Sequence, residues 1–304
     1  MPLLHHFGAG EPNHPLGFVV GCGGAGCNAL HALPHLNRFE PVSVNDLPTT
    51  AMAGIAKHLL IPKWKLRGLA EVDDSIMREL RSEEEKKLAE FLGHPDLVFV
   101  VAGLGGEMGS WASNVAVRVA NKVGAATVTI VNTPFKVEGP GRQATAAEAF
   151  KLLQSRADGL ITFPNDGISK VAPSLPLGKA FEVLGHFMAQ PVAMLSAVAT
   201  LDDMKALKPS LRKAAYVRFG AGSNSTVDDP QKLAVEEALR SPWFDMPVET
   251  AVAAVVVLEG DLGPRQVERV AYDLKERLDT ADLFVGVVQR PGREVAAKLL
   301  LGFY

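Results

Sequence analysis

The sequence predicts an α/β fold with two domains: a parallel, doubly wound domain, then a long central helix and a smaller α/β domain with a mixed sheet. Three observations support this prediction. Short apolar runs rich in Val and Ile alternate with segments of helical character, which is typical of parallel strands buried on both faces. A glycine-rich turn follows the first of these runs directly. A long apolar stretch then separates two regions that both alternate in this way.

The predicted strands of the first domain are five short apolar runs. They comprise residues 17–20, 41–46, 97–103, 127–132 and 159–163. Between the second and third, residues 74–92 have apolar side chains at helical spacing, and the charged run 83–87 marks the solvated face of that helix. We therefore expect strands and helices to alternate through the first domain.

The predicted central helix covers residues 175–198, and we expect Pro191 to kink it. Beyond this helix, four strand-like and two helix-like segments predict a mixed α/β domain that ends on a strand. The predicted boundaries are therefore 1–174, 175–198 and 199–304.

The composition excludes several classes of function. The chain of 304 residues has a formal charge of −3 with Lys and Arg scattered along it, which disfavours nucleic-acid binding. Apolar runs such as 97–104 are too short to span a bilayer and the start lacks the features of a signal peptide, so we expect a cytoplasmic protein without direct membrane insertion. The histidines lack metal-ligand spacing, so we expect no protein-ligated metal, and His5 and His6 lie in an expected frayed start.

Gly21, Gly23 and Gly26 form a G-x-G-x-x-G turn after the first strand. Such glycines let backbone amides and a helix N-terminus approach phosphate. Asp46, at the end of the next strand, supplies the acid that a dinucleotide fingerprint places on ribose. By this pattern alone the chain would be an NAD(P)-dependent oxidoreductase. Both cysteines lie in the same turn, and we interpret them as packing residues rather than as a redox pair.

A second glycine-rich turn follows the third strand, over residues 102–110. Two such turns at the carboxyl ends of strands in one sheet would direct two sets of amides toward one crevice, which suits a diphosphate or triphosphate. Residues 133–142 and 160–166 then offer an acid, a cation and a side-chain amide after the fourth and fifth strands.

Taken in order, the motifs G-x-G-G-x-G-x-N, G-L-G-G-x-x-G-S, T-P-F-x-x-E-G-x-x-R and L-I-T-x-P-N-D resemble those of the tubulin/FtsZ superfamily, above all its FtsZ branch. The resemblance runs from about residue 18 to the end of the chain and is densest at 127–166. Each motif alone is weak, but together in this order they are specific. The resemblance implies a GTP-binding or GDP-binding domain.

The resemblance also implies a set of nucleotide-binding positions. In the family, both glycine loops hold phosphate, the ribose acid and its basic partner fall on Glu138 and Arg142, and the guanine-contacting asparagine falls on Asn165. On the central helix the base-reading position falls on Gly185 or His186. The full set is Gly21, Cys22, Gly23, Gly24, Ala25, Gly26, Asn28, Asn45, Asp46, Gly103, Gly105, Gly106, Glu107, Met108, Gly109, Ser110, Pro134, Glu138, Arg142, Asn165, Phe181, Gly185 and His186.

Several positions depart from the family pattern. Glu107 and Met108 stand in a loop that reads G-G-G-T-G in the family. A carboxylate about 4–6 Å from a triphosphate would cost a few kcal/mol at an effective dielectric of about 20, so Glu107 must point away, act through Mg²⁺ or weaken binding. The acid of the second loop, 45–47, is shifted along the chain. The segment that senses the γ-phosphate begins as Arg67-Gly68-Leu69 but lacks the family's glycines over 70–74.

Hydrolysis in this family is completed between subunits by an acid loop after the central helix, which corresponds to residues 198–205 here. Asp203 matches its second acid, whereas Val198 and Thr200 replace its asparagine and its first acid. We expect low or absent activity unless Asp202 substitutes as a catalytic acid. A role for Asp202 as a helix cap is an equally good interpretation.

Three hypotheses of function follow. The first is a slow GTPase that assembles head-to-tail into filaments. The second is a nucleotide-binding scaffold that does not hydrolyse GTP, and the third, an NAD(P)-dependent oxidoreductase, rests on the fingerprint and Asp46 alone. The expected partners are further copies of this chain, as a protofilament or dimer, and other FtsZ-like proteins. The sequence up to Tyr304 contains no match to the family's flexible linker or membrane-recruiting peptide, so we expect any membrane tether to come from a partner.

Overall fold

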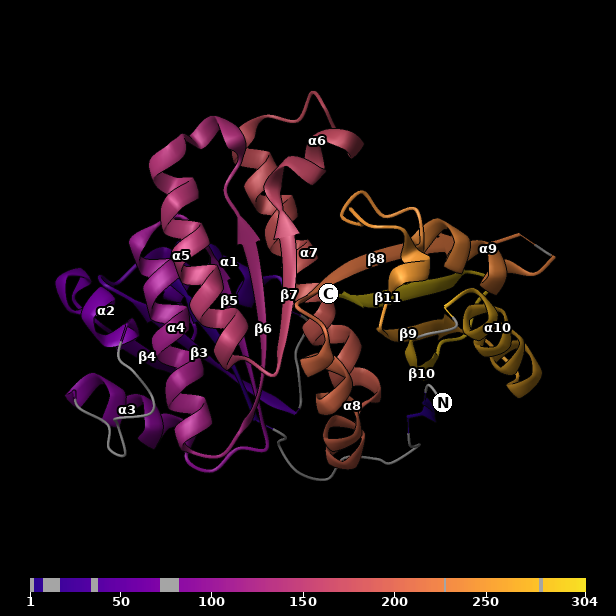
Figure 1. Ribbon diagram of the computed structural model, residues 1–304, viewed down its shortest axis with the longest axis horizontal. Coiled ribbons are helices and arrows are strands. Elements are labelled where there is room, and N and C mark those ends of the chain that lie inside the picture. Colours follow the sequence, from indigo (N-terminus) through magenta and orange to yellow (C-terminus); the bar gives the residue numbers. More distant parts are fainter. Residues whose placement is uncertain (1–2, 8–16, 34–37, 72–81, 227, 279–280) are drawn as a thin grey trace. The chain divides into compact units, whose positions relative to one another are not determined.

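The computed structural model describes residues 3–7, 17–33, 38–71, 82–226, 228–278 and 281–304 (Figure 1). Two compact units make up the chain. The N-terminal unit is Pro12–Ala193, and the C-terminal unit combines Met1–Glu11 with Met194–Tyr304. The beginning of the chain, assigned to the first domain by the sequence prediction, thus groups with the C-terminal unit.

The N-terminal unit contains a parallel sheet of six strands in the order β7-β6-β5-β2-β3-β4. The strands are β2 (Gly17–Cys22), β3 (Phe39–Asn45), β4 (Lys57–Leu60), β5 (Leu97–Gly103), β6 (Ala126–Thr133) and β7 (Gly159–Pro164). From β2 the chain winds outward first through β3 and β4, then in the other direction through β5, β6 and β7. This order confirms the predicted doubly wound α/β fold. β4, a strand of four residues, was not predicted.

Helices connect and cover these strands. They are α1 (Gly23–His31), α2 (Lys63–Ala70), α3 (Glu83–Leu92), α4 (Glu107–Lys122), α5 (Pro140–Arg156) and α6 (Ile168–Val171), with single turns η1 (Thr50–Met52), η2 (Lys136–Glu138) and η3 (Asn165–Gly167). α4 is buried along most of its length because α2, α3 and α5 all contact it (Figure 1). Of the helix predicted over 74–92, α3 is the described part, and residues 72–81 lie outside the described residues.

Helix α7 (Leu177–Val198) matches the predicted long apolar helix and continues through Pro191. Within the described residues, the segment Gly178–Val198 is the one helix with the length and composition of a membrane span, and half of its most apolar window is buried in the protein. The sequence-based statement that apolar segments are too short to cross a bilayer is therefore wrong for α7. Its buried side chains, including Leu184, Met188 and Leu195, make it equally typical of a core helix.

The C-terminal unit has a mixed sheet in the order β1-β10-β9-β11-β8, as the sequence predicts for this part of the chain. Its elements are β1 (Leu4–His6), α8 (Leu201–Lys213), β8 (Tyr216–Asn224), α9 (Pro230–Ala238), η4 (Val248–Thr250), β9 (Ala253–Gly260), α10 (Pro264–Arg277), β10 (Asp282–Gln289) and β11 (Val295–Phe303). β1, β10 and β9 are parallel, while β11 is antiparallel to both β9 and β8. Apolar residues of β9, β10 and β11 form a core with α9 and α10.

The start of the chain corrects an expectation. Residues 4–6, predicted to lie in a frayed segment, form the edge strand β1 and pair with β10. The backbone N–H of Phe7 also donates to Val285 O at 2.8 Å. A strand of three residues has too little sequence pattern to be predicted, because its stability comes from its partner strand.

Candidate functional site

Two glycine turns meet at the centre of the N-terminal sheet. β2 and β5 are neighbours, with Cys22 opposite Ala102, and both strands end in a glycine turn that begins a helix. The chain leaves β2 toward one edge of the sheet and leaves β5 toward the other. In open α/β sheets, the crevice outside such a switch point is the usual place for a ligand.

Close backbone packing explains some of these glycines. A methyl group on Gly109 would overlap the carbonyl oxygen of Gly103, and one on Gly26 would overlap that of Val101. At Gly23, where φ is +68°, an added Cβ would lie 2.9 Å from the backbone nitrogen of Gly109. The start of α1 therefore packs against the first turn of α4, and these glycines are required for folding whether or not a ligand binds.

Gly24 and Gly106 differ, because a Cβ added to either would have no atom within 4 Å apart from those of adjacent residues and its own helix backbone. Neither has a backbone conformation that favours glycine: φ of Gly106 is −93°, and Gly24 lies in the first turn of α1. Protein packing therefore does not account for the missing side chains at these two positions. The missing side chains leave space in front of both turns, and a ligand would need this space to approach the backbone closely.

The first-turn amides of α1 and α4 have no side-chain cap. A helix N-terminus has unpaired N–H groups and a partial positive charge, so two of them side by side favour an anion. The Ser110 hydroxyl is fully buried and accepts a hydrogen bond from the N–H of Gly105 at 2.9 Å. Ser110 therefore shapes the loop from inside instead of presenting its hydroxyl to the crevice.

Glu107 and Met108, which depart from the family pattern in the second glycine turn, have different surroundings. Met108 is buried and belongs to the hydrophobic core of the unit, so its side chain does not face the crevice. Glu107 is exposed at the first position of α4, and it has no ion-pair partner among the described residues. Its carboxylate interacts favourably with the helix N-terminus that a phosphate would use.

The ends of β6 and β7 contribute polar groups beside the second turn. Asn165 is buried, and its Oδ1 accepts a hydrogen bond from Nδ2 of Asn132 at 2.8 Å. Oδ1 of Asn132 is buried without a hydrogen-bond partner in the described structure. Asn132 was not predicted as a site residue, although it ends the fourth predicted strand, and ligands bind at the carboxyl ends of strands in such sheets.

Glu138 and Arg142 form an ion pair of 2.6 Å at the start of α5. Oε1 of Glu138 also accepts from the backbone N–H of Phe135 at 2.7 Å, and its side chain is largely buried. Pro134 lies against Gly105, which brings this segment beside the second glycine turn. The acid and the cation that the sequence singles out are therefore paired with each other near the crevice.

Candidate base-contacting residues lie on α7 and α1. The Phe181 ring is 40% exposed and packs edge-on against Phe135, with centroids 5.7 Å apart. Gly185 faces open space, His186 is exposed, and Asn28 is exposed on α1. Neither the His186 nor the Asn28 side chain has a hydrogen-bond partner in the described part of the chain.

Asn45 and Asp46 end β3 in different ways. Asn45 is buried, and its backbone oxygen accepts from the N–H of Ile61 at 2.8 Å. Asp46 forms an ion pair of 3.0 Å with Lys63, and its side chain is 18% exposed. The dinucleotide interpretation needs this acid to bind ribose, so the existing ion pair of Asp46 weakens that interpretation.

The cysteines have the surroundings of packing residues. Cys22 and Cys27 are both buried, and Cys27 Sγ approaches the carbonyl oxygen of Gly21 at 3.5 Å. Burial raises the pKa of Cys27 to about 11, and it raises the pKa of Cys22 well above its ordinary value. Both remain thiols at neutral pH, the unreactive form. Cys22 and Ala25 can thus contribute to a ligand site through the backbone of the turn.

The segment expected to sense the γ-phosphate begins inside a helix. Arg67, Gly68 and Leu69 lie in α2 and not in a loop. Arg67 pairs with Glu71 at 2.7 Å and with Glu148 at 3.0 Å. Of residues 70–74, where the family's glycines are missing, residues 72–74 lie outside the described residues.

The acid segment lies in the C-terminal unit, where Thr200 is the N-cap of α8. Asp203 is buried, and its Oδ2 accepts from the backbone N–H of Thr200 at 2.8 Å and from its hydroxyl at 2.7 Å. Asp202 is exposed and pairs with Lys205 at 3.1 Å. The cap is therefore built by Thr200 and Asp203, not by Asp202.

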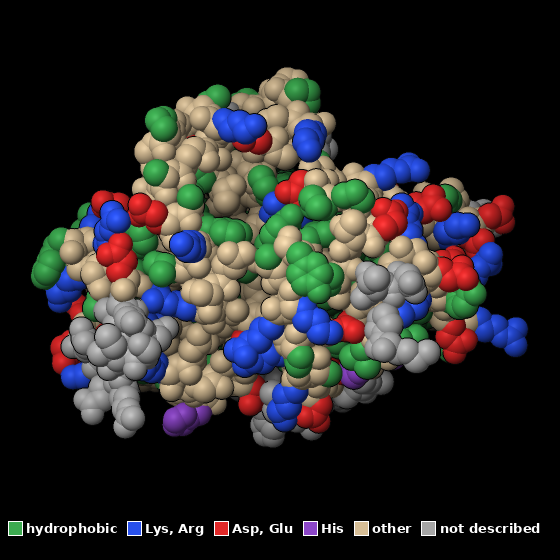
Figure 2. Space-filling model, in the orientation of Figure 1, with side chains coloured by type: hydrophobic (Ala, Val, Ile, Leu, Met, Phe, Trp, Pro, Cys, Tyr) green, Lys and Arg blue, Asp and Glu red, His purple; other side chains and the backbone are tan. Residues whose placement is uncertain are grey.

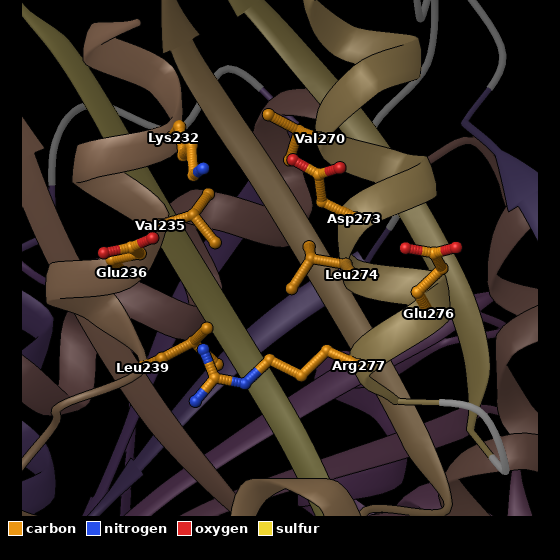
Figure 3. A pocket seen from close by; sticks show the side chains of 9 residues that line it. All are labelled: Lys232, Val235, Glu236, Leu239, Val270, Asp273, Leu274, Glu276 and Arg277. Carbon is orange, nitrogen blue, oxygen red and sulfur yellow. The ribbon is translucent and has the colours of Figure 1, made fainter.

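The C-terminal unit has a hollow of its own. Figure 3 shows a groove between α9 and α10 whose floor is apolar, with Val235, Leu239, Val270 and Leu274, and whose rim is charged, with Lys232, Glu236, Asp273, Glu276 and Arg277. On the face drawn in Figure 2, Lys and Arg side chains are interspersed with Asp and Glu. In the described ranges, His, Cys, Asp and Glu do not gather in threes as metal ligands would.

Comparison with known proteins decides the family. Residues 18–173 match the model of the Tubulin/FtsZ family, GTPase domain. The chain belongs to the Tubulin/FtsZ family. Among its relatives, cell division protein FtsZ 1 of Pyrococcus abyssi is 31% identical over 93% of this chain and 79% of its own length. Cell division protein FtsZ of Methanothermobacter thermautotrophicus is 32% identical over 86% of this chain and 71% of its own length.

Solved structures of family members have the same fold. A mutant FtsZ of M. jannaschii superposes with a TM-score of 0.81, at 28% identity, over 94% of this chain and 90% of its own. CetZ2 of Haloferax volcanii, solved as a GTPγS-bound protofilament, gives a TM-score of 0.74 at 20% identity over 94% of this chain and 92% of its own, a likeness of fold alone. With the family established, the oxidoreductase hypothesis loses its basis.

Proposed function

We propose that this chain binds a guanine nucleotide in the crevice between the β2 and β5 turns, and that it assembles head-to-tail into cytoplasmic protofilaments. The observation that carries the proposal is the pair of uncapped helix N-termini on adjacent strands, with Gly24 and Gly106 facing open space in front of them. Phosphate is the ligand that such an arrangement suits best. The family relationship supports guanine as the base and assembly with further copies.

The proposal gives these residues the following roles. The amides of both turns hold the phosphates, and Glu138 with Arg142 contacts the ribose. Asn165 contacts the base through Nδ2, since its Oδ1 already accepts from Asn132. Mg²⁺, when bound with a triphosphate, offsets charge at the phosphates, which makes the nearby Glu107 carboxylate compatible with binding.

Hydrolysis is slow in this proposal. Head-to-tail assembly would place the acid segment of one subunit at the nucleotide of the next, in a heterologous contact that does not close. The carboxylate of Asp203 is buried and engaged with Thr200, so it is poorly placed to hold a water directly. A hydrolysis-deficient scaffold is the second candidate function, and this burial of Asp203 is the observation that favours it.

The test is turnover as a function of protein concentration. Purified protein is incubated with GTP and Mg²⁺, phosphate release is followed, and assembly is measured in parallel by sedimentation. A slow GTPase of this kind releases phosphate at a rate that rises more steeply than protein concentration, as sedimenting polymer forms. Polymer with unchanged GTP would favour the scaffold, and protein that neither takes up GTP nor sediments would overturn the proposal.

A further inference from the structure

His5 and Asp203 form a hydrogen-bonded pair at the start of α8. Nε2 of His5 lies 2.7 Å from Oδ1 of Asp203, although the two residues are far apart in sequence. An ionised carboxylate only accepts hydrogen bonds, so Nε2 carries the proton and Nδ1 is the acceptor nitrogen of the neutral ring. Within the described chain Nδ1 makes no hydrogen bond.

The two members of this pair differ in accessibility. The Asp203 side chain is 5% exposed and that of His5 is 29% exposed. The other oxygen of Asp203 is held by the N–H and the hydroxyl of Thr200. The group of this pair that a water or a neighbouring molecule can reach is therefore the imidazole of His5.

The position of His5 is fixed by the strand that carries it. Around β1, Leu3 O accepts from the N–H of Leu283 and the N–H of Phe7 donates to Val285 O, both at 2.8 Å. The ring of His5 packs against Phe284 with centroids 5.4 Å apart. In this arrangement a buried carboxylate holds the protonated nitrogen of the ring, and the second nitrogen is free. An oriented catalytic base has the same arrangement.

We propose that His5 is the residue that accepts a proton from the attacking water when this face completes the nucleotide site of the next subunit, with Asp203 as its positioning residue. This inference rests on the function proposed above. Thr200 replaces the family's first acid, and His5 would provide the proton-accepting group that is missing there.

The proposed step is the hydrolysis of a nucleoside triphosphate. The water oxygen forms a bond to the γ-phosphorus, and the bond from that phosphorus to the β,γ-bridging oxygen breaks, leaving its electron pair on the diphosphate. One proton of the water passes to Nδ1 of His5 and is then released to solvent. The products are the nucleoside diphosphate and inorganic phosphate.

The decisive variant is His5→Gln, with His6→Gln as its matched control. The Gln side chain can still donate to Asp203 from the position of Nε2, but it has no acceptor nitrogen at the position of Nδ1. His6 is the next residue of β1, is exposed, and makes no hydrogen bond among the described residues. Full-length proteins are compared for GTP uptake, sedimentation with GTP and Mg²⁺, and the kcat and KM of phosphate release.

The expected result is a fall in kcat of about a hundredfold or more for His5→Gln, the lower range for loss of a general base, with KM, uptake and sedimentation unchanged. The His6→Gln protein retains wild-type turnover. His5→Ala, measured with and without added imidazole, provides a second test that does not depend on the fold of the Gln variant: turnover lost by truncation is partly restored by imidazole.

Two results would overturn the inference. If wild type hydrolyses GTP and both His5 variants match it within twofold, His5 does not act in the reaction, and the proposed function stands. If wild type takes up GTP and sediments without releasing phosphate, there is no hydrolysis for His5 to serve. Failure of wild type to take up GTP at all would instead contradict the proposed function.

Discussion

The glycine turns of the N-terminal unit and the acid segment of the C-terminal unit begin helices in opposite ways. α1 and α4 start without side-chain caps, and their first turns face open space at Gly24 and Gly106. α8 starts with a reciprocal capping box between Thr200 and Asp203. An uncapped start leaves amides available for a ligand, whereas a capped start satisfies them within the chain.

α3 begins with a capping box like that of α8, whereas α1, α2, α4, α5 and α9 have no side-chain cap. In α3 the capping box is formed by Ser82 and Glu85. What α1 and α4 share is that their uncapped N-termini follow two adjacent strands and that Gly24 and Gly106 face open space.

The largest expected effect comes from a glycine required by packing. Gly109→Ala would place a methyl group on the carbonyl oxygen of Gly103, and the backbone on both sides would have to move. We expect a loss in the free energy of unfolding of about 3 kcal/mol or more, at the upper end for overpacking. Urea denaturation followed by circular dichroism measures it, and a change below 1 kcal/mol, roughly the threshold for a tolerated swap, would show that the turns are not packed as described.

The next effect separates binding from folding. Gly106→Ala adds a methyl group that meets nothing within 4 Å beyond its own chain neighbours, so the free energy of unfolding should change little. The same methyl group would occupy the space in front of the second turn. We expect GTP affinity to fall by about tenfold or more, which corresponds to about 1.4 kcal/mol, as measured by equilibrium binding of labelled GTP. Unchanged affinity would mean that a nucleotide does not approach this turn.

A smaller effect tests the capped start of α8. Thr200→Ala removes the hydroxyl that caps the helix and should cost about 1 kcal/mol in the free energy of unfolding. The matched change Asp202→Ala removes only an exposed ion pair to Lys205 and should stay within about 0.5 kcal/mol of wild type. Equal costs for the two variants would contradict the assignment of the cap, and denaturant titration of both proteins distinguishes the outcomes.

The smallest effect is a pH dependence at the other end of α8. Burial raises the pKa of Asp282, but the N–H of Leu3, Lys213 and Ser210 lower it more, so the net shift is downward. A carboxyl with a lowered folded-state pKa stabilises the protein above its unfolded pKa, near 3.9, and this contribution disappears as pH falls through the folded value. Asp282→Asn should therefore be less stable than wild type at neutral pH, and the difference should shrink in acid. A difference that grows on acidification would contradict this sign.

Periodicity and glycine turns allow much of this fold to be predicted from sequence. The five predicted strands of the first domain became β2, β3, β5, β6 and β7, because each is a buried Val- and Ile-rich run with a clear end. Strands β1 and β4 and helix α2 were missed since they are short. In α2, Gly68 and the family pattern favoured a loop, but a helix forms there because Leu66 and Ala70, one turn apart, are both buried.

The placement of the candidate site residues was predictable where it depends on the local sequence, and not where it depends on distant contacts. Both glycine turns and Asn165 follow from their position after strands. The burial of Asp203 does not follow from its neighbours in sequence, because one of its partners, His5, is 198 positions away. In the same way, sequence alone cannot tell that Gly109 is fixed by packing while Gly106 faces open space.

The most direct test of a nucleotide site at the β2 and β5 turns is the nucleotide content of the purified protein. The protein is denatured, released nucleotides are separated by ion-exchange chromatography, and the measurement is repeated after incubation with GTP and Mg²⁺, with Gly106→Ala treated in parallel. We predict GDP or GTP in wild type and a reduced amount in the variant. Wild-type protein that contains no guanine nucleotide, and takes up none, would contradict the account.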